Sequence, residues 1–358
     1  MANIVGINHG KRPVLEIRHG EIQIWKSPGW ATPSTSIGLL TTVTLANTTG
    51  DIVKTWGDQF AQKGTDGTTW TIYGDDFKPA STFSTNSASW FISSTDIAHQ
   101  YLTLSSSSGT NIFKTSDMSK PIASSSTYYY FDQTVAMKDG AVFAKTNGAN
   151  VNYPNYLFKV VNGGFEYVTA NFINNYAISS YDDNFYSYQA GGAQAKINKM
   201  DSKGNVLVTG TPDNKTVVEV SRINPTTHQA VYDAAGNMFA LGHNGTIWYI
   251  TKATTGGALT EVAVNLLIYM QMYIDKIGNI YLFDVPNSSS DYYGNRDVRV
   301  TKLSNNLEQQ WQKTIGKGLI DNTNPNVMVT DSGLIYVQRA TQANQTGRVL
   351  DVYQQTNI

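Results

Sequence analysis

Histidines and carboxylates are the side chains that most often carry acid–base or metal chemistry in proteins. The five histidines of this 358-residue chain are scattered, so a histidine-centred catalytic or zinc site has no support. The sequence also lacks a G-x-S-x-G nucleophile turn, a P-loop, an H-E-x-x-H motif and a dinucleotide fingerprint. Because cysteine is absent, disulfides and thiolate metal sites are excluded. We therefore predict that the protein is not an enzyme and has no catalytic residue, no metal site and no cofactor.

Three acidic segments contain oxygen atoms of the kind that bind Ca²⁺: Asp75-Asp76, Asp182-Asp183 and residues 321–324. None has the regularly spaced donors of a dedicated calcium loop, so we interpret them as residues that cap turns. Residues 66–70 are similar to the Asp-box of sialidases, but the segment is one residue short and occurs once. Propeller glycosidases need an acidic pair and often several inward arginines, and this chain has only seven arginines. A hydrolase is therefore an alternative and not the leading hypothesis.

Two long segments have the composition of carbohydrate-binding loops. Residues 147–156 and 287–297 are rich in Asn and Tyr, and both are longer than the connections expected in a compact domain. An aromatic ring packs against the C–H face of a sugar while planar polar groups bind its hydroxyls, and long loops on a rigid scaffold often carry binding residues. The alternative is that both segments are surface insertions or subunit contacts. The residues that we predict to bind a glycan are Tyr153, Asn155, Tyr156, Tyr292, Tyr293, Asn295 and Arg296.

The overall composition excludes several classes of protein. The chain carries 26 Lys and Arg against 27 Asp and Glu, which argues against a nucleic-acid partner because such a partner needs a concentrated excess of positive charge. No run of about 18 apolar residues is present, so we expect no membrane insertion. The first residues lack the charged and then apolar pattern of a signal peptide, so we expect that the protein does not use the ordinary secretory route.

A recurring unit of strand, Asp-containing turn and strand organises most of the chain. Clear copies span residues 231–241, 272–283 and 328–337. In each copy we expect the Asp to cap the turn, and Gly or Asn to take the positive φ angle that the turn needs. A weak helical pattern at residues 266–274 is equally typical of a strand. The Asp residues that start the turns have a mean spacing of about 44, the size of a four-stranded propeller blade, and they stand at positions 66, 96, 139, 182, 233, 275 and 331.

The two ends of the chain are predicted to share one sheet. A second unit of strand, polar turn and strand follows the Asp turns, but after Asp331 only one further strand remains, at residues 348–353. Residues 42–56 have the form of this second unit and precede the first turn, so they can complete the last sheet and remove two exposed edges. We predict an all-β fold, a β-propeller of seven blades closed by this N-terminal strand. Six blades and an open β-sandwich are the alternatives.

Residues 1–30 carry a shorter repeat of their own. Pairs of residues recur ten positions apart and predict two short hairpins with Gly turns: Ile7 and Ile17, His9 and His19, Gly10 and Gly20, and Val14 and Ile24. The two histidines are a poor metal pair, because no third ligand has a fixed spacing from them. We expect an N-terminal docking module at 1–30, a linker at 31–40 and the propeller at 41–358. The residues predicted to dock are Ile7, Val14, Ile17, Ile24 and Trp25.

This duplicated segment, which ends in Trp25, resembles a short element of tail and baseplate proteins from bacteriophages that infect Gram-positive hosts. The Cys-free composition, rich in Ser, Thr, Asn, Gly and Tyr, is similar to that of phage tail proteins. The resemblance implies a virion tail protein, outside the cell after host lysis, whose partners are other tail or baseplate proteins. It also implies that the propeller faces outward and attaches to a host cell-surface polysaccharide. A glycan-active hydrolase or lyase on the same scaffold and a purely structural virion protein are the alternatives, and a homo-oligomer is left open.

Overall fold

The structure of the chain is a computed structural model. The residues that it describes are 16–19, 22–26, 36–45, 50, 52–55, 58–85, 91–95, 101–137, 139–146, 152, 156–170, 175–181, 184–189, 196–203, 205–210, 230–233, 235, 237–243, 247–254, 259–266, 268–275, 277–286, 289–321, 324–330, 332–343 and 346–356.

Across these residues the chain forms seven antiparallel sheets of four or five strands and one two-stranded hairpin. The first sheet contains β4 (Ile52–Lys54), β5 (Phe60–Lys63), β6 (Thr69–Tyr73) and β7 (Pro79–Ser84). The second contains β8 (Phe91–Thr95), β9 (Tyr101–Ser106), β10 (Gly109–Lys114) and β11 (Ala123–Ser125). The third contains β12 (Phe131–Ala136), β13 (Val142–Thr146), β14 (Leu157–Val161) and β15 (Gly164–Thr169). The fourth contains β16 (Asn175–Tyr181), β17 (Asn184–Gln189), β18 (Lys196–Met200) and β19 (Val206–Gly210).

The remaining sheets come from the C-terminal part of the chain and from its start. The fifth contains β20 (Ala230–Tyr232), β21 (Met238–His243), β22 (Trp248–Ala253) and β23 (Leu259–Val264). The sixth contains β24 (Ile268–Ile274), β25 (Ile280–Val285), β26 (Asn295–Leu303), β27 (Gln309–Asp321) and β28 (Asn324–Pro325). The seventh contains β29 (Val327–Val329), β30 (Ile335–Gln342), β31 (Thr346–Thr356) and β3 (Ser36–Thr44). The hairpin contains β1 (Glu16–His19) and β2 (Ile22–Lys26).

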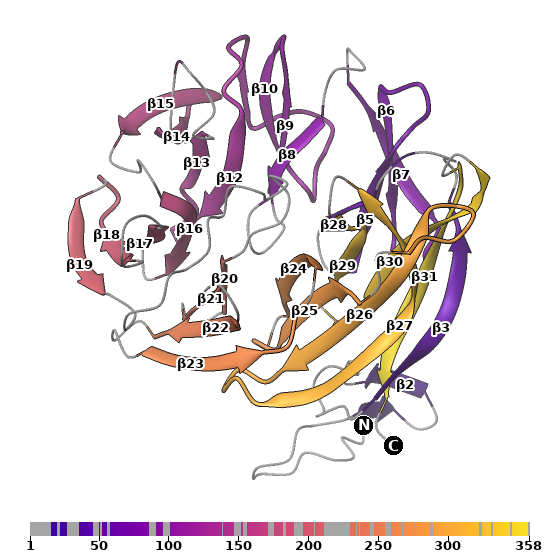
Figure 1. Ribbon diagram of the computed structural model, residues 1–358. Coiled ribbons are helices and arrows are strands. Elements are labelled where there is room, and N and C mark those ends of the chain that lie inside the picture. Colours follow the sequence, from indigo (N-terminus) through magenta and orange to yellow (C-terminus); the bar gives the residue numbers. More distant parts are fainter. Residues whose placement is uncertain are drawn as a thin grey trace.

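The all-β prediction is therefore confirmed over the described residues. The segment with a weak helical pattern, 266–274, contains strand β24. In Figure 1 the seven sheets follow one another around the molecule in the order of the chain, and β3 and β31 lie side by side in the seventh sheet. Among the described strands, all pairs join strands that are consecutive in sequence, except that β3 pairs with β31.

The seventh sheet joins the two ends of the chain, as the sequence predicted. Its outermost strand, β3, pairs antiparallel with β31, and the Thr42 hydroxyl donates to Asp351 Oδ1 at 2.7 Å. This strand begins at Ser36, earlier than the predicted start at residue 42, and so includes part of the predicted linker 31–40. The earlier start has an energetic reason, because Ile37 is 2% exposed and joins the apolar cluster between the sixth and seventh sheets.

The core lies between neighbouring sheets because the sheets are apolar on both faces. Strand β25 is buried throughout, and alternate side chains point to opposite faces of a sheet. Ile280 and Leu282 pack in a cluster shared with the fifth sheet, whereas Tyr281 and Phe283 pack in a cluster shared with the seventh. Similar clusters join the first sheet to the second and the second to the third. Each sheet therefore needs a neighbour on each side to cover it.

The seventh sheet also packs against the first. Phe60 and Tyr73 of the first sheet share a buried cluster with Tyr336 of the seventh. The Gly50 carbonyl accepts hydrogen bonds from Gln62 Nε2 at 2.9 Å and from Gln338 Nε2 at 2.7 Å, and so connects both sheets. A Cβ atom on Gly50 would lie 2.1 Å from the carbonyl oxygen of residue 63, so this close approach requires glycine.

Carboxylates cap the turns between strands, as the sequence predicted. At the β24–β25 turn, Asp275 Oδ1 accepts hydrogen bonds from the N–H groups of Ile277 (3.1 Å) and Asn279 (2.9 Å), while Gly278 has a φ of 90°. The Asn279 side chain donates to Asp275 Oδ2 at 2.7 Å, so Asn stabilises the turn by this bridge and Gly takes the positive φ. The same bridge recurs four residues apart in other turns: Asp201 with Asn205, Asp233 with Asn237, and Asp291 with Asn295.

Three predicted turn positions are out of phase with the rest: Asp66, Asp139 and Asp331. In the β12–β13 turn the place equivalent to Asp275 is Met137, whose N–H donates to the Ala141 carbonyl at 2.7 Å, and Asp139 stands two residues later. Thr330 caps the β29–β30 turn, accepting from Leu334 N–H at 3.1 Å, whereas the predicted Asp331 lies outside the described residues, as do Asp96 and Asp182. Asp66 caps the β5–β6 turn, but the place equivalent to Asp275 is Thr55, in the β4–β5 turn. The interval from Asp66 to Asp96 is 30 residues, whereas the interval from Thr55 to Asp96 is 41 residues, which is close to the mean spacing of about 44. The first repeat looked short in the sequence because Asp66 belongs to the β5–β6 turn and not to the equivalent β4–β5 turn.

A cross-strand pair of aromatic residue and lysine marks the same repeat. In the second to sixth sheets an aromatic residue of the second strand stands opposite a lysine of the third strand, and the ammonium lies 5.5 to 5.7 Å from the ring centroid in three of the five pairs. Cation–π attraction at such a distance contributes about 0.5–1 kcal/mol at exposed sites and more when water is excluded. The pairs are Tyr101–Lys114, Phe143–Lys159, Tyr186–Lys199, Phe239–Lys252 and Tyr281–Lys302.

The last of these pairs belongs to a buried polar chain between the sixth and seventh sheets. The Lys302 ammonium donates to Gln355 Oε1, Gln355 Nε2 donates to the Tyr281 hydroxyl at 2.6 Å, and that hydroxyl donates to Asp275 Oδ2 at 2.9 Å. Burial lowers the pKa of Lys302 to about 8, although the Asp275 carboxylate favours the charged form. Burial likewise raises the pKa of Asp275 above its usual value.

We predict that the unfolding free energy rises between about pH 7.5 and 9.5 because of Lys302. Its folded-state pKa is about 8 and its ordinary value is 10.5, so in this range the unfolded chain binds a proton that the folded chain has lost. Guanidinium unfolding of the wild type and of Lys302→Met, followed by tryptophan fluorescence at each pH, measures the effect. The wild type should gain stability over the range and the variant should not; equal pH profiles for the two proteins would contradict the prediction.

Candidate functional site

The two segments predicted to bind glycan occupy equivalent places in their sheets. Residues 147–156 join β13 to β14 in the third sheet, and residues 286–294 join β25 to β26 in the sixth. Each is thus the connection from the second to the third strand. The structure describes Tyr156, Tyr292, Tyr293, Asn295 and Arg296, whereas Tyr153 and Asn155 lie outside the described residues.

The β25–β26 connection ends in a tight turn built on Asp291. The Asp291 N–H donates to the Asn295 carbonyl at 2.8 Å, and Gly294 N–H donates to the Asp291 carbonyl at 3.0 Å, with a φ of 86° at Gly294. The carboxylate accepts from the N–H groups of Tyr293 and Asn295, each at 2.9 Å. Burial opposes the ionisation of Asp291, but the hydrogen bonds from Asn295 and Tyr293 outweigh it and lower its pKa. The ionised carboxylate therefore fixes the backbone around two tyrosines.

Tyr292 and Tyr293 form an aromatic patch at the tip of this turn. Tyr292 is 84% exposed and Tyr293 is 38% exposed. Their ring centroids lie 5.4 Å apart and their planes meet at 76°, the edge-to-face arrangement that aromatic pairs favour. A tyrosine has few rotatable bonds, so a ligand that packs on it orders little flexible chain. The patch can therefore bind the apolar face of a small ring and still offer two hydroxyl groups.

Asn295 anchors the turn, in contrast to its predicted role as a glycan contact. Its side chain is 2% exposed, with Oδ1 accepting from Ala340 N–H at 2.8 Å and Nδ2 donating to the Ala340 carbonyl at 2.9 Å. Strand β29 pairs with β30 as far as Val337, and among the described strands none pairs with Ala340 on that side. The Asn295 amide therefore replaces a missing strand, and its polar atoms are occupied within the protein.

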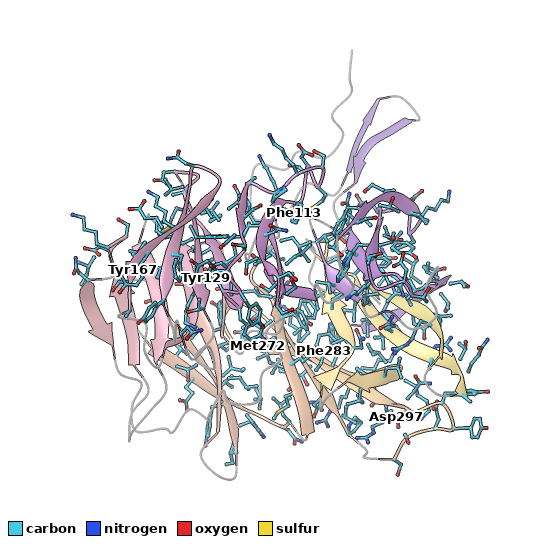
Figure 2. The ribbon with its side chains drawn as sticks, turned by 90° about the horizontal axis from the view of Figure 1, so that it is seen from above. Phe113, Tyr129, Tyr167, Met272, Phe283 and Asp297 are labelled. Atoms are coloured by element: carbon cyan, nitrogen blue, oxygen red, sulfur yellow. The ribbon has the colours of Figure 1, made fainter. Side chains whose placement is uncertain are left out.

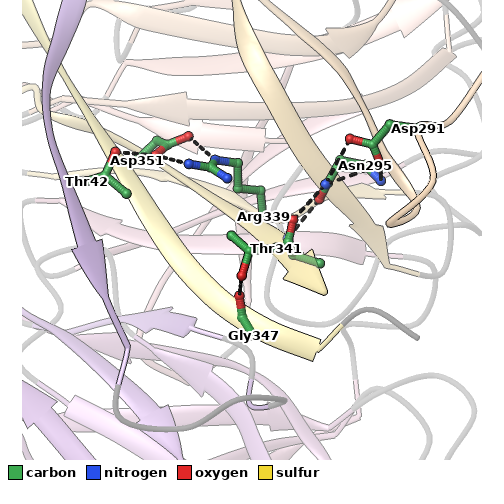
Figure 3. Close-up of polar contacts among 8 residues, drawn as sticks. Thr42, Asp291, Asn295, Arg339, Thr341, Gly347 and Asp351 are labelled. Carbon is green, nitrogen blue, oxygen red and sulfur yellow. Dashed lines mark hydrogen bonds and ion pairs between the residues drawn. The ribbon is translucent and has the colours of Figure 1, made fainter. Parts of the chain in front are cut away.

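The anchor belongs to a polar layer across the seventh sheet, shown in Figure 3. Arg339 Nε of β30 donates to Asp351 Oδ2 of β31 at 2.6 Å, and Thr42 of β3 binds the other oxygen of the same carboxylate. The Thr341 hydroxyl donates to the Gly347 carbonyl at 2.6 Å and closes the β30–β31 turn. The tyrosine turn thus rests on the sheet that contains both ends of the chain.

Arg296 and Asp297 begin strand β26, directly beside the tyrosine turn. Arg296 is partly buried opposite Gly318 of β27, and Asp297 forms an ion pair with Lys317 at 3.1 Å. In Figure 2 Asp297 lies at the lower edge of the view, while the β1–β2 hairpin projects from the upper edge. The tyrosine turn and the N-terminal hairpin are therefore at opposite ends of the molecule.

The β13–β14 connection brings Tyr156 beside an exposed tyrosine that the sequence prediction did not include. Tyr156 N–H donates to Thr146 Oγ1 at 2.8 Å, and its ring centroid lies 5.3 Å from that of Tyr167 on β15. Tyr167 is 52% exposed. The signal in the sequence was the alternation of Phe165 and Tyr167, which points two aromatic rings to one face of a short strand.

The predicted docking residues are described in part. Ile17 lies in β1, opposite Trp25 of β2, and Ile24 lies in the same strand as Trp25. The other two predicted residues, Ile7 and Val14, lie outside the described residues, as does the first of the two predicted hairpins. Among the described strands, β1 and β2 pair only with each other.

The described residues contain no cluster of three His, Asp or Glu side chains that could hold a metal ion. Asp76, from one of the acidic segments of the sequence, caps the β6–β7 turn by accepting from Lys78 N–H at 3.1 Å. Burial, together with the charges of Asp58 and Asp76, raises the pKa of Asp75. No helix in the described part of the chain has the length and apolar character needed to cross a membrane.

Comparison with known proteins gives likenesses among solved structures alone. No protein-family model matches the chain, and no curated protein matches it. Among solved structures, the crystal structure of BamB from Moraxella catarrhalis is similar with a TM-score of 0.46 and 13% sequence identity, over 89% of this chain and 100% of that chain. A likeness at this level decides neither the detailed fold nor the function of this chain.

We predict that Asn295→Ala lowers the unfolding free energy by about 3 kcal/mol, because it leaves the buried N–H and C=O groups of Ala340 without partners. Chemical denaturation of the purified variants measures this change. The matched control is Asn306→Ala, on an exposed turn, which should change stability by less than about 0.5 kcal/mol. A similar loss in both variants would show that Asn295 is not an anchor.

Proposed function

We propose that the seven sheets are the blades of a closed, seven-bladed β-propeller. The order of the sheets, the apolar clusters between neighbours and the contact of the seventh sheet with the first support this arrangement. Radial closure gives every sheet a neighbour on both faces, which a sheet buried on both faces requires. The proposal further requires a direct contact between the fourth and fifth sheets.

On this scaffold the protein binds a host cell-surface glycan at the β25–β26 turn. The observation that carries the proposal is the exposed pair Tyr292 and Tyr293, held on a turn that Asp291 and Asn295 make rigid. Stacking on an exposed aromatic ring removes the C–H face of a sugar from water, and the tyrosine hydroxyls can hydrogen-bond to sugar hydroxyls. Charge near the turn is balanced, because Asp297 pairs with Lys317, and this suits a ligand with little net charge.

The N-terminal hairpin attaches the protein to a virion, as the resemblance to phage tail and baseplate proteins implies. A two-stranded hairpin is at best marginally stable by itself in water, so β1 and β2 need a surface to cover them. The hairpin contributes Ile17 and Trp25, which stand opposite each other across the strand pair, to that contact, and it projects away from the end that carries the tyrosine turn (Figure 2). The partner is another tail or baseplate protein, and the tyrosine turn then faces the host.

We predict that Tyr292→Ala with Tyr293→Ala lowers glycan binding at least tenfold without lowering the melting temperature by more than a few degrees, because both rings are at the surface. Binding is measured on an array of purified cell-wall and capsular polysaccharides from Gram-positive bacteria. The matched control is Ile277→Ala, an exposed apolar residue on the β24–β25 turn, which should bind like the wild type.

Two results of this experiment would contradict the proposal. Unchanged binding by the double variant would remove the β25–β26 turn from the site. Release of soluble oligosaccharide from the bound polysaccharide would favour the second candidate, a glycan-active hydrolase. The raised pKa of Asp75, beside Asp58 and Asp76, is the observation that favours that candidate, because a general acid needs such a shift.

We predict that Ile17→Asp with Trp25→Asp prevents the protein from joining virions, because two charges would disrupt an apolar contact of the hairpin. The measurement is an immunoblot of particles purified from cells that make the variant in place of the natural chain. The protein should be depleted at least tenfold in the particles, while the purified variant still binds polysaccharide. Normal incorporation of the variant would contradict the docking role.

A further inference from the structure

We propose that Tyr156 and Tyr167 form a second carbohydrate-binding site on the third sheet, so that one chain binds two segments of the same repeating polysaccharide. The inference rests on the proposed glycan binding at the β25–β26 turn, but a different set of residues carries it. Its ligand class is a neutral sugar unit of a surface polymer.

The geometry of Tyr167 supports a stacking surface. Tyr167 lies near the end of β15, the outer strand of the third sheet, and half of its side chain is in contact with solvent. Two edge-to-face contacts hold its ring: with Tyr156 at 5.3 Å and 62°, and with Phe158 at 6.1 Å and 75°. The ring is therefore positioned before any ligand arrives, which limits the entropy lost on binding.

Aromatic residues below Tyr167 prevent it from turning inward. Phe158 is buried and packs against Tyr129, with ring centroids 4.7 Å apart, and against Phe131 at 5.7 Å. Phe165 fills the adjacent position at 5.1 Å from Phe131. In Figure 2 Tyr167 lies toward the outer edge of the molecule and Tyr129 lies farther in. Because this layer is filled, Tyr167 remains at the surface.

The distribution of charge favours a neutral ligand. Phe165 and Tyr167 alternate with Glu166, so the two rings share one face of β15 and the carboxylate stands on the other. Glu166 lies opposite Lys159 of β14, so the positive charge of this strand pair is also on the face away from the rings. The aromatic face thus has no charged neighbour on either strand. An anionic polymer would find no cation there, whereas the C–H face of a neutral sugar can stack.

The two tyrosine pairs are placed so that one polymer can reach both. Each lies at the connection from the second to the third strand of its sheet, and in the proposed propeller all such connections are on one end. When two sites bind one molecule, the second contact becomes intramolecular, and the overall affinity can exceed that of either site by 10²–10⁴. A repeating surface polysaccharide offers many identical units, so it suits a pair of sites of this kind.

The test is the stoichiometry of binding for the single repeating unit of a polysaccharide that the wild type binds on the array. Isothermal titration calorimetry should give two sites for the wild type, and one each for Tyr167→Ala and for Tyr292→Ala with Tyr293→Ala. Tyr167→Phe, which keeps the ring, should retain two. Affinity for the whole polymer should fall at least tenfold in Tyr167→Ala.

The outcomes separate this inference from the proposed function. If the wild type has one site and the Tyr292→Ala, Tyr293→Ala variant has none, the second site is overturned and the proposed function stands. If the wild type has one site and Tyr167→Ala has none, the site on the third sheet is supported and the β25–β26 turn is excluded as a glycan-binding site. Failure of the wild type to bind any polysaccharide on the array would overturn both. Thermal unfolding of each variant controls for loss of fold, and the exposure of Tyr167 predicts only a small shift.

Discussion

The pairing of β3 with β31 is the contact on which the rest of the structure depends. It joins Thr42 to Asp351, 309 residues away, and it supplies the outer strand of the seventh sheet. Without it β31 would be an exposed edge, and Ile37 would leave the cluster between the sixth and seventh sheets. The entropy cost of closing so long a loop grows only slowly with its length. Burial of apolar faces on the seventh sheet, toward both the sixth and the first, can therefore offset it.

Burial on both faces of the sheets also decides where a ligand can bind. A strand such as β25 presents alternate side chains to two neighbouring sheets, so its faces are filled by protein. Turns and outer strands remain, and the exposed tyrosines are found there, with Tyr292 on a turn and Tyr167 on an outer strand. Hydrogen bonds hold the segments that carry these tyrosines. Asn295 donates to the Ala340 carbonyl beside the Tyr292 turn, and Thr146 accepts from the N–H of Tyr156, which packs on Tyr167. Stability and proposed binding therefore use different residues of the same segments.

Much of the architecture was readable in the sequence because it repeats. The Asp turns, their glycines and the incomplete last unit recur often enough that local preferences predict strands, turns and the joining of the two ends. The prediction was wrong in phase at three turns, where Thr55, Met137 and Thr330 take the places expected for Asp66, Asp139 and Asp331. Thr330 caps its turn with a hydroxyl, Met137 holds the same place with an apolar side chain, and the Thr55 hydroxyl has no hydrogen-bond partner among the described residues. Residue type alone therefore does not identify equivalent positions. The aromatic–lysine pairs would have corrected the phase, but they become visible only when strands are set in register.

The sequence by itself determined the class of structure and the segments that project from it, because strand periodicity and turn chemistry are local properties of the chain. It also indicated Tyr292 and Tyr293 as surface aromatics in a long connection. Only the tertiary structure decided the role of each polar residue there. Asn295 and Tyr292 are three residues apart in one turn, yet one is buried against β30 and the other is in solvent. That difference arises from where β29 stops pairing with β30, a contact between segments distant in sequence. The partnership of Tyr156 with Tyr167 likewise depends on the register of β14 and β15.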